Sequence, residues 1–327
     1  MDNLYIMADD VVKTAPSNSV VLDLPTYKEK LQIAVMRLDD AEMEFDIIGI
    51  NPALVNAFRR ILISDVPTMA IEKVTIHQNK TVIQDEVLAH RLGLIPLKAN
   101  PRHFQYRLAG DETGTDRDSL HYSLNVKCTK NPHCRPGHYR PEDLYVNHQV
   151  LSSDIKWTPI GGQSRMFKEE DVVAVNDDIL IAKMRPGHEL HVTMVAVKSC
   201  GRDHAKFCPV GTASYRLLPH IKLLEEITGH DADTLQRCFS PGVIAVENDK
   251  KGRKVARVDN PRIDMCSRNV LNEPHLKDKV VLGRVKDHYI FTIESVVNVT
   301  PDELFKESIK IMKKKCADAL AETKKFL

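Results

Sequence analysis

Residues 51–99 of this chain read NPALVNAFRRILISDVPTMAIEKVTIHQNKTVIQDEVLAHRLGLIPLKA, and the fold assignment starts from them. Asn51 can accept a hydrogen bond from a free backbone N–H at a helix start, and Pro52 suits a first turn that needs no donor. Apolar side chains then recur at helical spacing: Leu54, Ala57, Phe58, Ile61 and Leu62. Pro67 disfavours helical geometry in the residue before it. We therefore expect a helix over 51–65.

Two further elements are expected in the second half of this stretch. Residues 74–83 have the pattern of a β-hairpin that turns near Asn79. Residues 84–92 form a short helical pattern, with Asp85 and Glu86 in the first turn, where negative charge complements the helix dipole. The expected order of elements in this stretch is therefore a helix, a hairpin and a helix with an acidic first turn.

Strand patterns lie on both sides of this stretch. Alternating apolar residues predict a hairpin with one buried face on each strand: Leu31, Ile33, Val35, then Met43, Phe45, Ile47. Later segments with strand patterns are 121–127, 190–197, 215–227 around Pro219, and a hairpin of 280–285 with 289–297. Residues 249–261 have the composition of a polar loop.

The last element is an amphipathic helix over 301–322. Its start, Thr300-Pro301-Asp302-Glu303, has the pattern of a capping box with proline in the first turn. One apolar stripe follows: Phe305, Ile309, Met312, Cys316, Ala319 and Leu320. Two amphipathic helices that frame a β-rich middle predict an α+β protein. The short strands beside them offer little cover, which indicates a helix interface with another chain.

Composition favours a protein whose partners are other proteins. Apolar residues make up 43% and charged residues 28%, and 46 basic residues against 45 acidic ones leave a net charge of +1. Independent binding to nucleic acid usually needs a positive excess. No apolar run approaches the roughly 20 residues that span a bilayer, so no membrane association is expected. Seven scattered cysteines indicate reduced thiols in an intracellular protein rather than a disulfide framework.

Four segments resemble the alpha-like subunit family of cellular RNA polymerases. The core is NAFRRILIS (56–64), followed by VIQDEVLAHRLGLIPL (82–97). HAKFCPVGTASYRLLP (204–219) and YIFTIESVVNVTPDELF (289–305) agree with it. The resemblance extends over roughly residues 30–322.

Within that family the chain is most similar to the larger alpha-like subunits shared by RNA polymerases I and III. The residue pattern of 204–219 favours this assignment to the polymerase I and III subunits. The lack of any Cys-x-Cys or Cys-x-x-Cys motif favours it as well. Relatives from polymerase II and many archaeal polymerases carry a tight four-cysteine metal cluster. The resemblance therefore implies no metal and no cofactor, with the polymerase II or archaeal counterpart as the alternative.

The resemblance also implies a domain organisation. A dimerisation domain, built from a sheet and two amphipathic helices, is expected from residues 29–71 and 210–327. A β-rich domain is expected to interrupt it over 72–209, and residues 1–28 are expected to be a flexible leader.

A non-catalytic assembly role is implied as well, with the chemistry on the large subunits and a location in the nucleus, including the nucleolus. The implied partners are a smaller alpha-like subunit as heterodimer partner, the second-largest subunits of polymerases I and III, and a small zinc-binding subunit. The double arginine is expected where the heterodimer meets the large subunit. The candidate interface residues are Leu54, Ala57, Phe58, Arg59, Arg60, Ile61, Leu62, Asp85, Glu86, Phe305, Ile309, Met312 and Cys316.

A zinc-dependent nucleic-acid-binding protein is the competing hypothesis from another class. Its four candidate ligands are Cys128, His133, Cys134 and His138. Their spacing puts two ligands on adjacent residues, whose side chains tend to point apart, and this argues against a site. Cys200, His204 and Cys208 supply only three ligands.

Two other patterns have ordinary readings that outweigh functional ones. The basic run could contact nucleic acid or act in nuclear import, but acidic neighbours favour a solvated loop: Lys250, Lys251, Arg253, Lys254 and Arg257. Glu86 and His90 are helical neighbours, yet no nucleophile or phosphate loop accompanies them, so helix-start charge explains them better than acid–base catalysis.

Overall fold

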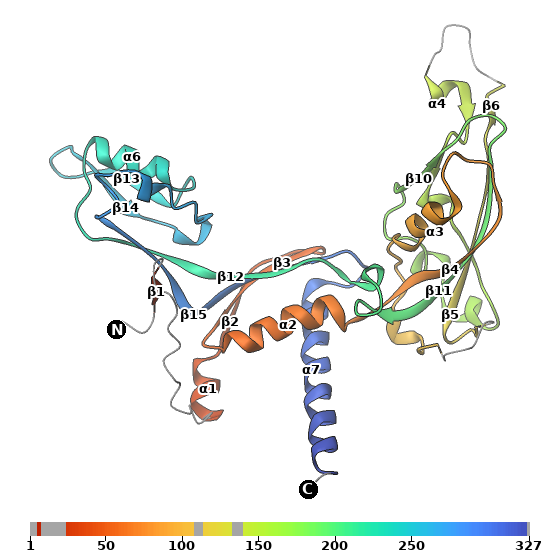
Figure 1. The fold of residues 1–327 in the computed structure, drawn as a ribbon, viewed down its shortest axis with the longest axis horizontal. Helices are drawn as coiled ribbons and strands as arrows, with labels where there is room; N and C mark the ends of the chain where they lie inside the picture. Colours follow the sequence, from red (N-terminus) through yellow and green to blue (C-terminus); the bar gives the residue numbers. More distant parts are fainter. Residues whose placement is uncertain (1–4, 8–23, 108–113, 133–139, 326–327) are drawn as a thin grey trace. The chain divides into compact units, whose positions relative to one another are not determined.

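The computed structural model describes residues 5–7, 24–107, 114–132 and 140–325. Helices and sheets are both present, and the α+β class is confirmed (Figure 1). The chain divides into two compact units. Unit 1 comprises Met1–Arg37, Glu44–Asn56 and Ser214–Thr292; unit 2 comprises Leu38–Met43, Ala57–Ala213 and Ile293–Leu327.

The secondary-structure elements are these. The helices are α1 Leu24–Lys30, α2 Pro52–Ser64, α3 Asp85–Gly93, α4 Pro141–Leu144, α5 Gln163–Met166, α6 His230–Cys238 and α7 Pro301–Thr323. The strands are β1 Tyr5–Met7, β2 Gln32–Leu38, β3 Glu42–Ile48, β4 Pro67–Asn79, β5 Ser119–Lys127, β6 Thr129–Lys130, β7 Tyr145–Val146, β8 Gln149–Leu151, β9 Lys156–Thr158, β10 Leu180–Lys183, β11 Glu189–Cys200, β12 Val210–Leu223, β13 Ile244–Asn248, β14 Lys254–Val258 and β15 Val280–Ser295.

Most of the sheet built from β1, β15, β3 and β2, with β12 also paired to β15, lies in unit 1. Phe45 on β3 and Phe291 on β15 pack with ring centroids 5.3 Å apart, which fixes the centre of this sheet. The expected leader, 1–28, falls largely outside the described residues. Within it the structure has β1, which pairs with β15, and the start of α1.

The predicted hairpin of β2 and β3 is present, but only one of its strands has a buried face. Phe45 and Ile47 on β3 are each 1% exposed. Ile33 and Val35 on β2 are 54% and 56% exposed. The prediction of a buried face was therefore wrong for β2, because β2 is the last strand of the sheet and nothing described in the chain covers it.

The hairpin predicted over 280–297 was also wrong, because β15 is one continuous strand of 16 residues. Its polar centre includes Asp287, whose carbonyl accepts a hydrogen bond from Gly49 N at 2.8 Å. Gly49 has φ +77°, and a Cβ there would overlap the carbonyl oxygen of Lys30, so glycine is required at this turn. Pairing with several strands keeps the polar segment of β15 extended.

A second layer of unit 1 is formed by α6 over the antiparallel pair β13 and β14 (Figure 1). Ala232 and Leu235 on α6 pack with Val243 and Ile244 in a buried cluster. The polar loop predicted over 249–261 was wrong in part, because residues 254–258 form β14. The sequence pattern is masked there by basic residues on the exposed side of the strand.

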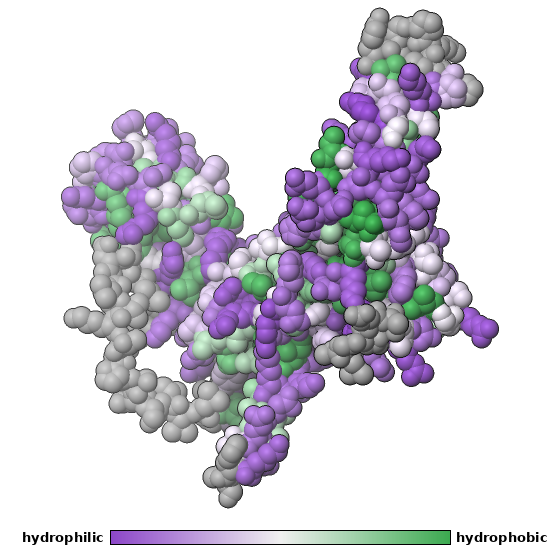
Figure 2. Space-filling model, turned by 45° about the vertical axis from the view of Figure 1, so that its right-hand side comes forward, coloured by the Kyte–Doolittle hydropathy of each residue, from purple (hydrophilic) through white to green (hydrophobic). Residues whose placement is uncertain are grey.

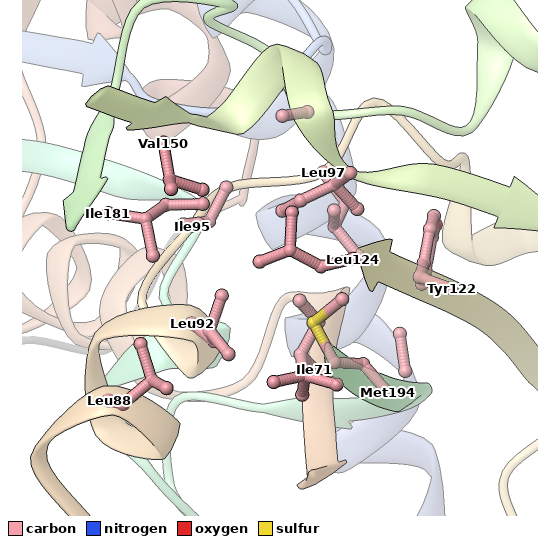
Figure 3. Close-up of a cluster of buried hydrophobic side chains, with 14 of the residues drawn as sticks. Ile71, Leu88, Leu92, Ile95, Leu97, Tyr122, Leu124, Val150, Ile181 and Met194 are labelled. Carbon is pink, nitrogen blue, oxygen red and sulfur yellow. The ribbon is translucent and has the colours of Figure 1, made fainter. Parts of the chain in front are cut away.

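Unit 2 contains an antiparallel sheet in the order β4, β11, β5, β9. One face of this sheet packs on α3 and on the loops around it, and the buried side chains meet as Figure 3 shows. Leu88 and Leu92 of α3 reach Ile71 and Met194 of the sheet within this cluster. This core belongs entirely to residues between 57 and 213.

The hairpin predicted over 74–83 was wrong. β4 runs from Pro67 to Asn79 and pairs along its whole length with β11, more than 100 residues later in the chain. The side chain of Asn79 instead closes a turn into α3, with Nδ2 donating to the Ile83 carbonyl at 2.9 Å and to Asp85 Oδ1 at 2.7 Å. The turn residue was correctly found, but it joins a strand to a helix.

The predicted helices agree with the structure more closely than the predicted hairpins do. α2 begins at Pro52, Asn51 Oδ1 accepts from Ala53 N at 2.8 Å, and the helix ends before Pro67. α3 and α7 also lie where expected. The capping box at Thr300 was wrong: its hydroxyl donates to Asp302 Oδ1 at 2.6 Å instead of capping the backbone. The described helices include none that is apolar over a length able to cross a membrane.

Candidate partner interface

The contact between α2 and α7 in unit 2 brings together the two predicted interface helices. The rings of Phe58 and Phe305 meet edge to face with centroids 5.4 Å apart. Leu62 is fully buried and Ile61 is 5% exposed, so both contribute to the interior of the chain itself. Leu304 and Phe305 are buried at the start of α7. The contact of Phe58 with Phe305 therefore marks where the two helices cross.

Beyond that crossing, a groove of about 580 Å³ lies between α2 and α7. Its walls are mostly apolar carbon with polar groups at one end. The lining residues are Ala57, Arg60, Ile61, Ser64, Asp65, Arg202, Met312, Lys315 and Cys316. Five of them are candidate interface residues chosen from the sequence: Ala57, Arg60, Ile61, Met312 and Cys316. The groove therefore gathers residues that are far apart in the chain.

An ion-pair cluster holds the polar end of the groove. Asp65, just after α2, has a side chain that is 9% exposed and pairs with Arg202 and with Lys315 of α7, the latter at 2.5 Å. Burial alone would raise the pKa of Asp65, but the hydrogen bonds and charges of Lys315 and Arg202 outweigh it and lower the pKa. The cluster ties α7 to the end of α2.

The second half of α7 has no cover within the described chain. Every residue from Lys313 to Lys325 is exposed, and Leu320 is 64% exposed. Ile309 and Met312 are half-buried, while Cys316 is exposed. In Figure 1 the C-terminal end of α7 extends with no other element of unit 2 beside it. An isolated amphipathic helix of this kind gains most of its stability by packing against another surface.

The other candidate interface residues named from the sequence do not line the groove. Arg59 is half-buried, and Leu54 is half-buried near the start of α2. Asp85 and Glu86 are exposed on α3, where Asp85 accepts the hydrogen bond from Asn79. The structure therefore divides the sequence-predicted set into a groove, a buried crossing and an exposed acidic helix start.

Sequence reasoning missed an exposed apolar surface on β2. Ile33 and Val35 lie on one side of the strand and Met36 on the other, and each is more than half exposed. The signal was available, since apolar residues on both sides of an edge strand indicate cover on both sides. Figure 2 shows hydrophobic residues reaching the surface among hydrophilic ones.

The candidate metal ligands do not come together in the part of the chain that the structure describes. His133, Cys134 and His138 lie outside it, and Cys128 is buried. Burial raises the pKa of the Cys208 thiol, which does not favour the thiolate that binds a metal. Among the described residues, no group of three or more His, Cys, Asp or Glu side chains is placed to hold an ion.

The basic run over 250–257 is largely neutralised by ion pairs. Arg253 pairs with Asp249 at 2.9 Å, and Lys254 with Asp233 at 2.7 Å. Arg257 pairs with Glu247 at 2.9 Å. Pairing of this kind leaves little free positive charge for phosphates.

Comparison with known proteins gives independent evidence for the family of this chain. The RNA polymerase Rpb3/Rpb11 dimerisation domain family matches residues 44–316. The chain is 50% identical over 300 residues to "DNA-directed RNA polymerases I and III subunit RPAC1" of Homo sapiens, covering 92% of this chain and 86% of that protein. For the Saccharomyces cerevisiae protein of the same name it is 46% over 292 residues, 88% and 86% of the two chains. For "DNA-directed RNA polymerase II subunit rpb3" of Dictyostelium discoideum it is 29% over 295 residues, 88% and 93%.

Proposed function

Because this chain belongs to the Rpb3/Rpb11 dimerisation family of RNA polymerase subunits, we propose that it is the larger alpha-like assembly subunit of RNA polymerases I and III. The observation that carries the proposal is the 50% identity over 92% of the chain to RPAC1, against 29% to the polymerase II relative. The role is non-catalytic: the subunit nucleates the enzyme that makes rRNA, 5S rRNA and tRNA, in the nucleus and nucleolus.

The proposed heterodimer uses α2 and α7 to bind a smaller alpha-like subunit. The groove between these helices and the uncovered half of α7 support this assignment, since together they offer an apolar surface with a polar end. A permanent interface of this kind buries on the order of 2,000 Å² or more. Met312 and Cys316 are the α7 residues that we place in contact with the smaller subunit.

The proposed domain organisation keeps the boundaries expected from the sequence. Residues 29–71 and 210–327 form the dimerisation domain, and 72–209 the inserted domain. The buried cluster around α3, β4, β5 and β11 supports an inserted domain with its own core. The exposed face of α3, with Asp85 and Glu86, is proposed to help hold a second-largest subunit, beside a small zinc-binding subunit.

Arg60 is proposed to contact the second-largest subunit. It is exposed at the rim of the groove, and its neighbour Arg59 is half-buried. An arginine at a rim can make bidentate contacts to partner carboxylates.

Affinity purification of the tagged chain from cells, with identification of the co-purified subunits, tests the whole proposal. Largest subunits of polymerases I and III should both appear. Recovery of the polymerase II largest subunit alone would replace this assignment by its counterpart. Zinc that stays bound in stoichiometric amount after dialysis would favour the metal-binding alternative.

Arg60→Ala separates the two kinds of contact in the same assay. The smaller subunit should still co-purify, while recovery of the second-largest subunit falls by about an order of magnitude, as for a good interface arginine. Arg117→Ala, at an exposed arginine away from the groove, is the matched control. Loss of the smaller subunit with the large subunit retained would overturn the division of roles.

A further inference from the structure

The sheet of unit 2 has a second face, opposite to the core of Figure 3. On β5 the side chains of Leu120, Tyr122 and Leu124 are buried, and the alternate positions within His121–Lys127 are half-buried or exposed. β4, β11 and β9 alternate in the same way over Lys73–His77, His191–Val195 and Lys156–Thr158. The outward side chains of the four strands therefore form one polar surface.

The strand register places these side chains in rows. Thr193 lies opposite Thr75 on one side and Ser123 on the other, and Ser123 lies opposite Lys156. Val195 lies between Lys73 and His121 in the next row. The outer strands are three strand spacings apart, about 14 Å.

Charge on this face is nearly all of one sign. Its members, which we call the sheet patch, are Lys73, Thr75, His77, His121, Ser123, Asn125, Lys127, Lys156, Thr158, His191 and Thr193. The only acidic side chain in the outward rows is Glu189, opposite Lys127, and it is already 3.8 Å from Lys80. Lys73, Lys127 and Lys156 form no ion pair with a described residue.

Histidines add to the polar character of the sheet patch. The rings of His77 and His191 are tilted against each other with centroids 4.7 Å apart, and His77 Nε2 lies 3.0 Å from Thr193 Oγ1. Hydroxyl groups of Thr75, Thr193 and Ser123 fill the space between the charged edges. The patch thus combines separated positive charges with a flat row of hydrogen-bonding groups.

The basic residues of the hairpin β13–β14 differ from these lysines because they form ion pairs within the chain. There Arg253, Lys254 and Arg257 each face a carboxylate of the chain. Surfaces evolved only for solubility usually mix both signs. Lys156 Nζ donates to the Ser153 carbonyl at 3.4 Å, but none of the three lysines has a carboxylate partner among the described residues. Lysines of this kind around a hydroxyl row indicate that the compensating negative charge comes from a partner.

Two classes of anionic partner differ in what they need. Single-stranded nucleic acid is usually bound on sheets by stacking bases on aromatic side chains, and the patch contains no Phe, Tyr or Trp. Three lysines also neutralise few phosphates. An acidic protein segment needs only spaced cations and hydrogen-bond donors.

We propose that the sheet patch docks an acidic, extended segment of a partner protein, with carboxylates placed against Lys73, Lys127 and Lys156. The segment crosses the hydroxyl row and accepts hydrogen bonds from Thr75, Ser123 and Asn125. None of these residues lines the groove between α2 and α7, so this contact is separate from the proposed heterodimer.

Fluorescence anisotropy with the full chain, purified together with whatever subunits accompany it, tests the proposal. The probe is a labelled Glu-Ser repeat peptide of about twelve residues, long enough to cross the sheet at 3.3 Å per residue. A Gln-Ser peptide of equal length and an oligonucleotide of mixed sequence are the comparison probes. The acidic peptide should bind, the Gln-Ser peptide should not, and the affinity should fall as salt is raised.

Charge reversal at Lys73, Lys127 and Lys156 to Glu should weaken binding of the acidic peptide by about tenfold or more. The matched control reverses three exposed lysines elsewhere, Lys250, Lys251 and Lys277, and should leave the affinity within about twofold. The single change Lys127→Glu keeps the test valid if the triple variant fails to fold. Equal loss in patch and control variants, no binding of the acidic peptide, or stronger binding of the oligonucleotide would each overturn the proposal.

Discussion

Neighbouring strands β2 and β3 carry the same alternation of apolar residues, yet their environments are opposite. Phe45 on β3 is 1% exposed and packs against Phe291 of β15. Ile33 on β2 is 54% exposed, although its side chain is as apolar. The difference comes from position, because β3 lies inside the sheet and β2 at its end. An alternating pattern therefore specifies a strand, while burial depends on what covers it.

The same contrast is seen along α7. Its stripe begins with Phe305, which is 8% exposed, and ends with Leu320, which is 64% exposed. A periodic stripe that continues past the point where the chain covers it is typical of an interface. Three measurements test this division between covered and uncovered apolar faces.

Phe45→Ala is expected to give the largest effect. Removing a ring buried against Phe291 should lower the free energy of unfolding by about 3–5 kcal/mol. Ile33→Ala on the neighbouring strand should change it by less than about 0.5 kcal/mol in the chain on its own. Urea denaturation of the two variants provides the measurement. Similar losses would mean that β2 is covered within the chain, and the comparison would fail.

Phe58→Ala should fall between these limits. The ring is half-buried and contacts Phe305 at 5.4 Å, so the loss should be about 1–3 kcal/mol rather than the full cost of a buried ring. Val82→Ala is the control, because Val82 is 84% exposed and should be nearly neutral. A loss at Phe58 as large as that at Phe45 would show that the α2–α7 crossing is already complete without a partner.

Asp65→Asn tests what holds the uncovered half of α7, with the smallest expected effect. Because the pKa of Asp65 is lowered in the folded chain, its carboxylate contributes stability above the ordinary carboxyl value. That contribution is lost as the pH falls through the lower folded-state pKa, below about 4. Asp65→Asn should therefore be less stable than the natural chain at neutral pH.

Thermal melts at several pH values provide the check for Asp65. The gap between the two proteins should narrow as the pH falls below about 4. A gap that stays constant across this range would mean that the ion pairs with Lys315 and Arg202 do not stabilise the folded chain.

Helices were the part of the fold that the sequence predicted well. The Asn51-Pro52 start and the stripe through Leu62 are local signals, and α2 follows them residue by residue. The errors at 74–83 and 280–297 have a shared cause. β4 is completed by β11, and β15 is completed by β1, β3 and β12. No local period in the sequence records partners so far away.

The candidate interface could be predicted from the sequence only in part. Helical spacing identified one apolar face, but it could not separate Leu62, which is fully buried, from Ala57 and Met312, which line the groove. That separation depends on where α7 crosses α2. The exposed apolar side chains of β2 were missed because the alternation of Ile33 and Val35 was assigned to a covered face and the apolar Met36 on the other side was not weighed.

The pairing of β3 with β15 also sets an order of events during synthesis on the ribosome. The sheet of β4, β11, β5 and β9 is complete once residue 200 has emerged, and it can fold at that point. Phe45 must wait for Phe291, about 250 residues later, and until then β3 can pair only with its neighbour β2. A nascent chain stalled between these points exposes β3 as well as β2, and is the species that most needs a chaperone.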